Sequence, residues 1–149
     1  MRAPALAVSL ALAFIACSRT PADPVRTLVD ELAAAAEARD ADRFGERLSK
    51  DFEGGGMSRV DSLATLRRYL AAYESVGVEI YSFEAERHGG TARVRCEVDF
   101  SGHARKIGGL EGLLPPSAVY RFELEVADEG DAWLVKRARW EQVPPAAQQ

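Results

Sequence analysis

Residues 91–102 read Thr-Ala-Arg-Val-Arg-Cys-Glu-Val-Asp-Phe-Ser-Gly, and polar and apolar side chains alternate through the stretch. Successive side chains of a strand point to opposite faces, so this period of two predicts a β-strand with one buried and one solvated face. Such two-faced strands are typical of antiparallel sheets. The residues expected on the buried face are Ala92, Val94, Cys96, Val98 and Phe100.

Three further strands are predicted around this one. Residues 78–87 precede it across the turn His88-Gly89-Gly90, which is typical of a hairpin. Residues 117–127 follow, and the turn at 128–131 leads into a last strand over 133–143. The sequence therefore predicts a four-stranded antiparallel sheet. Its other face is expected to carry cross-strand charge pairs between Arg93, Arg95, Arg121, Arg137 and Arg139 and Glu97, Asp99, Glu123 and Glu125.

The first half of the chain predicts three helices. Asp23-Pro24 combines an N-cap with proline at the first helical position, and apolar residues recur at helical spacing as far as Ala36. Asp40 is expected to cap a short second helix in which Phe44 and Leu48 share a face.

Ser58 and Asp61 have the spacing of a capping box, which predicts the start of a third helix. Glycines 54–56 are expected to be a flexible connection between the second and third helices. The apolar face expected for the third helix is Val60, Leu63, Leu66, Leu70 and Tyr73. Helices followed by strands indicate the α+β class, with three N-terminal helices packed on one face of the sheet.

Residues 1–16 have the pattern of a secretory signal peptide, because a positive start is followed by an uncharged apolar run too short to span a bilayer. The run ends at Phe14-Ile15-Ala16-Cys17, which resembles the lipobox of bacterial lipoproteins. The resemblance implies that Cys17 is acylated and becomes the mature N-terminus. Ser18, rather than Asp, at the next position implies the outer membrane facing the periplasm. An ordinary signal peptide with a cysteine near the cut is the alternative.

Composition bounds the remaining possibilities. The length of 149 residues fits one domain, and the formal net charge of -4 argues against nucleic acid as a partner. Residues 17–23 are expected to be a lipidated tether, 24–143 the folded domain and 144–149 a flexible tail. Lipidation of Cys17 would leave Cys96 without an intramolecular partner, so Cys96 is expected to be buried. No metal site or cofactor is predicted, since His88 and His103 have no further ligand at suitable spacing.

Over residues 24–143 the chain resembles the nuclear transport factor 2-like superfamily (NTF2-like, SnoaL/ketosteroid isomerase-type, cystatin-like). The resemblance rests on the element order, the charged turn 38–40, the segment 48–52 and the closing strand 133–140. It implies a curved sheet that wraps the helices around a conical pocket. Members include isomerases, dehydratases, epoxide hydrolases and cyclases as well as binding and accessory domains, so the fold does not choose the activity.

The residues expected to line this pocket are Phe52, Tyr73, Tyr81, Phe100, Tyr120 and Trp140. The apolar residues Ile107, Leu110, Leu113 and Leu114 are expected either to lie at its mouth or to fill it. No catalytic residue is assigned. The sequence thus favours a membrane-anchored lipoprotein that binds a small apolar ligand or acts as an accessory module.

Two alternatives remain open. One is a small enzyme of the isomerase, dehydratase or cyclase type, with Glu53 or Asp51 as base and a pocket tyrosine as its partner. The other is an envelope scaffold that binds a protein through the apolar residues 107–114.

Overall fold

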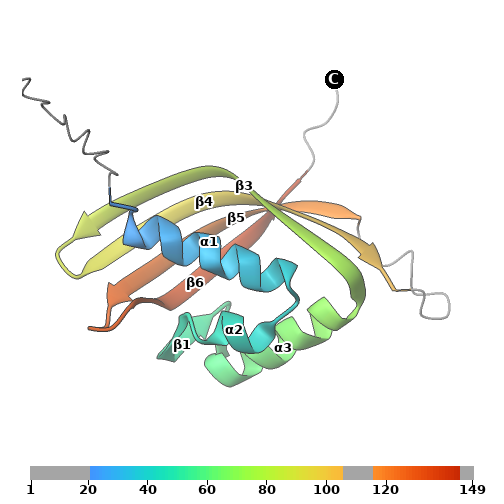
Figure 1. Cartoon of the computed structure of the whole chain (residues 1–149), viewed down its shortest axis with the longest axis horizontal. Coiled ribbons are helices and arrows are strands. Elements are labelled where there is room, and N and C mark those ends of the chain that lie inside the picture. The colour runs from blue at the N-terminus through green and yellow to red at the C-terminus, as the bar shows by residue number, and fades with distance from the viewer. Residues whose placement is uncertain (1–20, 106–115, 145–149) are drawn as a thin grey trace, which may run out of the picture.

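The computed structural model describes residues 21–105 and 116–144, and these form three helices packed against one mixed sheet (Figure 1). Figure 1 shows the first helix running along one face of the sheet, with the other two helices and the first strand gathered at one side. No helix in these residues is long and apolar enough to cross a membrane. The elements are α1 (Pro24–Glu37), α2 (Ala41–Gly45), β1 (Leu48–Gly54), β2 (Met57–Ser58), α3 (Arg59–Ala71), β3 (Tyr73–His88), β4 (Thr91–Ala104), β5 (Ser117–Asp128) and β6 (Trp133–Val143).

The sheet has six strands in the order β2-β1-β6-β5-β4-β3, not the four expected from the sequence. The four predicted strands are present and pair as antiparallel neighbours, and β1 adds to β6 in parallel. Leu48 begins β1 instead of ending a helix, because α2 stops at Gly45. The glycines predicted to connect two helices belong to the β1–β2 hairpin instead: Gly54 ends β1, and Gly55 and Gly56 form the turn with φ of 56° and 79°.

Helix α1 begins where the sequence predicts. The side chain of Asp23 accepts a hydrogen bond from the backbone N–H of Val25 at 2.9 Å, with Pro24 in the first turn. Asp23 also forms an ion pair with Arg87 near the end of β3, so the start of the helix is tied to the sheet. The face turned to the sheet is buried and consists of Val25, Leu28, Val29, Leu32, Ala35 and Ala36.

Helix α3 begins at the predicted cap, since the Ser58 side chain accepts from the backbone N–H of Asp61. Its apolar face differs from the prediction at two positions. Val60 is 74% exposed, because it lies in the first turn on the side away from the sheet. Tyr73 lies beyond the helix and is the first residue of β3.

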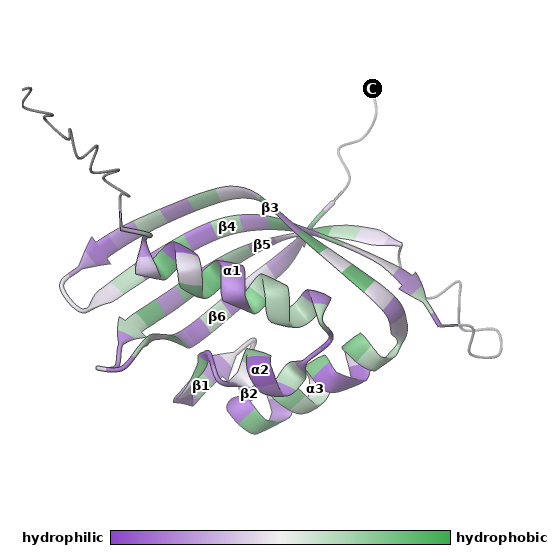
Figure 2. Cartoon of the chain, viewed as in Figure 1, coloured by the Kyte–Doolittle hydropathy of each residue, from purple (hydrophilic) through white to green (hydrophobic). Residues whose placement is uncertain are grey.

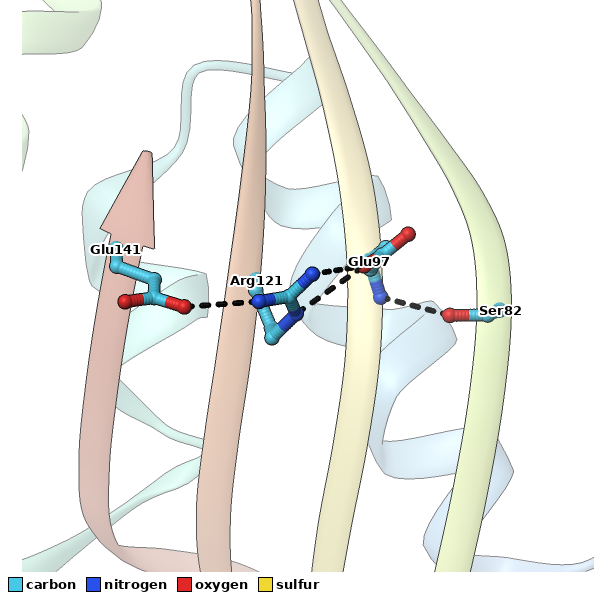
Figure 3. Close-up of polar contacts among 4 residues, drawn as sticks. All are labelled: Ser82, Glu97, Arg121 and Glu141. Carbon is cyan, nitrogen blue, oxygen red and sulfur yellow. Dashed lines mark hydrogen bonds and ion pairs between the residues drawn. The ribbon is translucent and has the colours of Figure 1, made fainter. Parts of the chain in front are cut away.

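The strands carry alternating side chains, visible as bands of hydropathy in Figure 2. The inner face of β4 is buried or half-buried as expected, and Cys96 is only 3% exposed. The outer face carries three of the predicted charge pairs, Arg95–Glu123, Arg121–Glu97 and Arg137–Glu125, whereas Arg93 and Arg139 form no ion pair among the described residues. Arg121 donates hydrogen bonds to Glu97 on β4 and Glu141 on β6, at 2.8 and 2.9 Å, while Ser82 on β3 accepts from the Glu97 backbone (Figure 3).

Candidate functional site

A cavity of about 310 Å³ lies between α1, α3 and the inner face of the sheet. The part of α1 that lines the cavity runs from Val29 to Ala36. Val25 and Leu28, nearer the start of the helix, pack in the hydrophobic core and do not line the cavity. Aliphatic and aromatic side chains make up most of its wall. The lining residues are Val29, Leu32, Ala33, Ala36, Phe44, Leu48, Phe52, Met57, Ser62, Leu63, Thr65, Leu66, Tyr69, Leu70, Val78, Ile80, Cys96, Val98, Phe100, Tyr120, Phe122, Leu124, Val135, Ala138 and Trp140.

The sheet side of the cavity carries a row of aromatic rings, here called the aromatic wall: Phe100 on β4, Tyr120 and Phe122 on β5, and Trp140 on β6. Neighbouring ring centroids lie 5.8 Å apart for Phe100 and Tyr120 and 6.3 Å apart for both Tyr120–Phe122 and Phe122–Trp140. Trp140 is 41% exposed, so the wall reaches from the interior to solvent. These separations are typical of favourable aromatic contacts.

Four of the six residues expected in the pocket line the cavity: Phe52, Phe100, Tyr120 and Trp140. Tyr73 does not line it. The Tyr73 side chain is buried behind that of Tyr69, with the two ring centroids 5.2 Å apart.

Tyr81 is also outside the cavity and is 57% exposed, with its hydroxyl donating to Asp99 at 3.1 Å. The cause is an irregularity in the β3–β4 register between Ile80 and Ser82. Strict alternation would place Tyr81 on the same face as Phe83. An extra residue in one strand shifts the alternation, so Ile80 and Phe83 both face inward and Tyr81 faces outward.

Helix α3 supplies the polar part of the cavity through Ser62, Thr65 and Tyr69. Their spacing of three and four residues places them on one helix face, and the sequence carried this signal although they were not predicted as site residues. Thr65 donates to the sulfur of Met57 at 3.9 Å, and the hydroxyls of Tyr69 and Tyr73 are 3.4 Å apart. The Ser62 Oγ is buried and has no hydrogen-bond partner among the described residues.

The tyrosines and the cysteine of the cavity are neutral at physiological pH. Burial raises the pKa of Tyr69 to about 12, and the Tyr73 hydroxyl adds to the effect. Burial, with a smaller contribution from Tyr69, also raises the pKa of Tyr120. Burial raises the pKa of the Cys96 thiol to about 11 against a weaker opposing effect of Arg26, so the thiolate is disfavoured.

Within the described residues the cavity wall contains no Asp, Glu, Lys, Arg or His. The two carboxylates considered as catalytic bases lie on β1 and are exposed. The Asp51 side chain is 87% exposed and lies 3.8 Å from Lys136, and Glu53 does not line the cavity either. The structure therefore does not bring either carboxylate together with a pocket tyrosine.

Other features add no second site. A shallow hollow between α1, α2 and α3 is lined by charged groups that pair with each other or with backbone: Arg67 with Asp42, and Arg39 with the carbonyl of Tyr73 at 2.9 Å. No group of three or more potential metal ligands occurs in the described ranges 21–105 and 116–144. Cys17 and the residues Ile107, Leu110, Leu113 and Leu114 lie outside those ranges.

Comparison with known proteins supports the architecture. No protein-family profile and no curated protein sequence matches the chain. Among solved structures, a candidate dehydratase of the NTF2-like family from Streptomyces avermitilis is 14% identical with a TM-score of 0.68, covering 82% of this chain and 96% of its own. A candidate aromatic ring hydroxylase from Novosphingobium aromaticivorans is 16% identical with a TM-score of 0.69, covering 82% and 88%.

The chain also matches part of a longer protein. Bd1075 of Bdellovibrio bacteriovorus is 13% identical with a TM-score of 0.66, and the match covers 80% of this chain but only 40% of Bd1075. Identities this low indicate a shared fold and leave the activity open. The chain thus has an α+β fold with a mixed six-stranded sheet and three helices, and its structural neighbours are NTF2-like proteins.

Proposed function

We propose that this domain binds a small, uncharged, ring-containing molecule in the cavity between the helices and the sheet. The observation that carries the proposal is the composition of the cavity wall: apolar and aromatic side chains with a few neutral hydroxyls, and no charged side chain among the described lining residues. Apolar pockets with a few placed polar groups are the usual form of small-molecule sites.

The aromatic wall favours rings over a flexible chain as the bound group. Its four side chains from three adjacent strands offer ring edges and faces to a flat ligand. The structural neighbours include a candidate aromatic ring hydroxylase, a name that is consistent with a ring-containing molecule in a protein of this fold.

Titration with N-phenyl-naphthylamine, a neutral probe whose fluorescence rises in apolar surroundings, tests the proposal. Val98 is 5% exposed on the inner face of β4 and lines the cavity, whereas Val119 on β5 does not line it. Val98→Phe is expected to fill the cavity and abolish saturable probe binding, and Val119→Phe is the matched control that keeps it. Undiminished binding by a folded Val98→Phe variant would refute the cavity as the site.

Binding is preferred to catalysis because the pocket tyrosines have no carboxylate partner from β1. A general base has to reach its proton within hydrogen-bond distance. Asp51 and Glu53 are exposed and lie off the cavity wall, so neither is positioned for this role.

We further propose that acylation of Cys17 anchors the domain to the outer membrane, facing the periplasm. The support is the apolar run of residues 5–16, its lipobox-like end and Ser18. Diacylglycerol plus a third chain would make the attachment effectively permanent. Radioactive palmitate is expected to label the wild type and not Cys17→Ala, and continued labelling of the variant would contradict the anchor.

A further inference from the structure

We propose that the Ser62 hydroxyl is the docking point for a carbonyl oxygen on the ring ligand, so that the cavity selects oxygenated rings over hydrocarbon rings of the same shape. This inference rests on the proposed function and assigns the polar contact within the same cavity.

Ser62 has an unusual position for a serine. It lies in the first turn of α3, lines the cavity, and its Oγ is buried without a hydrogen-bond partner in the described part of the chain. A helical serine usually satisfies its hydroxyl on the carbonyl four residues earlier, or on water. A buried hydroxyl left unpaired is unfavourable, and an acceptor atom brought by a ligand removes that cost.

The other hydroxyls on this face of α3 are less available. Thr65 contacts the sulfur of Met57. Tyr69 lies about two helical turns beyond Ser62, so it belongs to a different end of the cavity, and its hydroxyl is paired with that of Tyr73. Ser62 is therefore the hydroxyl on this face of α3 that is buried and has no hydrogen-bond partner among the described residues.

The cavity walls define the rest of the ligand. A carboxylate or an amine would be desolvated here without an ion-pair partner among the described residues, which is strongly unfavourable. The aromatic wall on the sheet accommodates the ring while the hydroxyl on α3 meets its oxygen. A neutral aryl ketone can contact the aromatic wall and accept a hydrogen bond from Ser62, whereas a hydrocarbon of the same shape can make only the first contact.

A matched pair of probes separates the two contributions. Acetylnaphthalene and isopropylnaphthalene have nearly the same shape, and the second lacks the oxygen. Their affinities are measured by displacement of N-phenyl-naphthylamine from the wild type, from Ser62→Ala and from Ser82→Ala. Ser82 lies on β3, is exposed and accepts from the Glu97 backbone, so it provides a serine-to-alanine control outside the cavity.

The wild type is expected to bind acetylnaphthalene more tightly than isopropylnaphthalene by about five- to tenfold, the contribution of one hydrogen bond. Ser62→Ala should remove this preference by weakening only the ketone, and it should fold because alanine favours helix and removes an unpaired hydroxyl. Ser82→Ala should retain the preference.

Four results would overturn the inference. Equal affinities in the wild type, or a preference that survives in Ser62→Ala, would leave the cavity as a site but reject Ser62 as its polar contact. Failure of both naphthalenes to displace a cavity-bound probe would reject the ligand class. Probe binding that Val98→Phe does not disturb would reject the proposed function, and this inference with it.

Discussion

Ser49 and Glu129 are 80 positions apart in the chain, yet the Ser49 hydroxyl donates to the Glu129 carboxylate at 2.8 Å. Lys136 donates to both of them, at 3.2 Å to Ser49 and 3.0 Å to Glu129. Ser49 is only 1% exposed, so this cluster satisfies a buried polar side chain while joining β1 to β6 and to the turn before β6.

Glu129→Gln is expected to lower the free energy of unfolding at neutral pH. The Ser49 hydrogen bond, and then Lys136, hold the pKa of Glu129 below its usual 4.5. Because the folded-state pKa is the lower one, this stabilisation is full above 4.5 and is lost as the pH falls through the folded-state value. The difference in free energy of unfolding between wild type and variant, measured by urea unfolding, should therefore become smaller below pH 4.5. Glu74→Gln, at an exposed carboxylate on β3, should show no such narrowing.

The Cys96 thiol is expected to resist a thiol reagent at neutral pH until the protein unfolds. It is 3% exposed, and burial raises its pKa to about 11 from 9.0. Since the unfolded state ionises first, stability should fall as the pH rises from 9 toward 11. Labelling kinetics with and without urea test the first point. Fast labelling of the native protein would show that the cavity opens to solvent more widely than the structure indicates.

Arg121→Glu should destabilise the protein more than Arg139→Glu. Arg121 bridges Glu97 and Glu141 across three strands, so its reversal places three carboxylates in one row (Figure 3). Arg139 lies on the same face of β6, and no ion pair to it occurs within the described residues. Urea midpoints at low and high salt provide the measurement. The loss of stability in Arg121→Glu should become smaller at high salt, because salt screens the repulsion between the carboxylates. A loss of stability that does not depend on salt would indicate a packing effect instead.

Gly54→Ala is expected to weaken binding of the neutral probe, whereas Gly56→Ala should leave it close to wild type. A Cβ at Gly54 would lie 2.6 Å from the Phe52 ring and 3.2 Å from that of Trp140, so both cavity rings would have to move. At Gly56 the same atom meets nothing within 4 Å, and its φ of 79° costs about 1–2 kcal/mol of stability alone. Equal probe affinity in both variants would show that the rings adjust freely.

The sequence predicted those parts of the fold that local pattern determines. Asp23 and Pro24 mark the start of α1, and the last predicted strand, 133–143, has the bounds of β6. The cap at Ser58 is also confirmed. In each case the deciding residues are neighbours in the chain, so their chemistry can be interpreted without the fold.

The errors occur where distant partners decide the structure. Residues 48–54 become a strand because β6 is there to pair with them, and their own pattern predicts this poorly. Tyr81 turns outward because of a register irregularity against β4, and the sequence marks it only by the spacing of three between the inward residues Ile80 and Phe83, where strict alternation gives two. The same limit applies to Ser62, whose unpaired hydroxyl becomes evident only once its surroundings are assembled.

The parallel pairing of β1 with β6 has a kinetic consequence. Ser49 and Lys136 are 87 residues apart, whereas β3 to β6 join through successive antiparallel neighbours. Closing so long a loop is entropically costly, and distant pairings slow folding. Leu48 and Phe52 of β1 line the cavity, so we expect its wall to be completed late in folding. A cavity ligand should therefore slow unfolding and leave the folding rate unchanged, as stopped-flow measurements in urea would reveal.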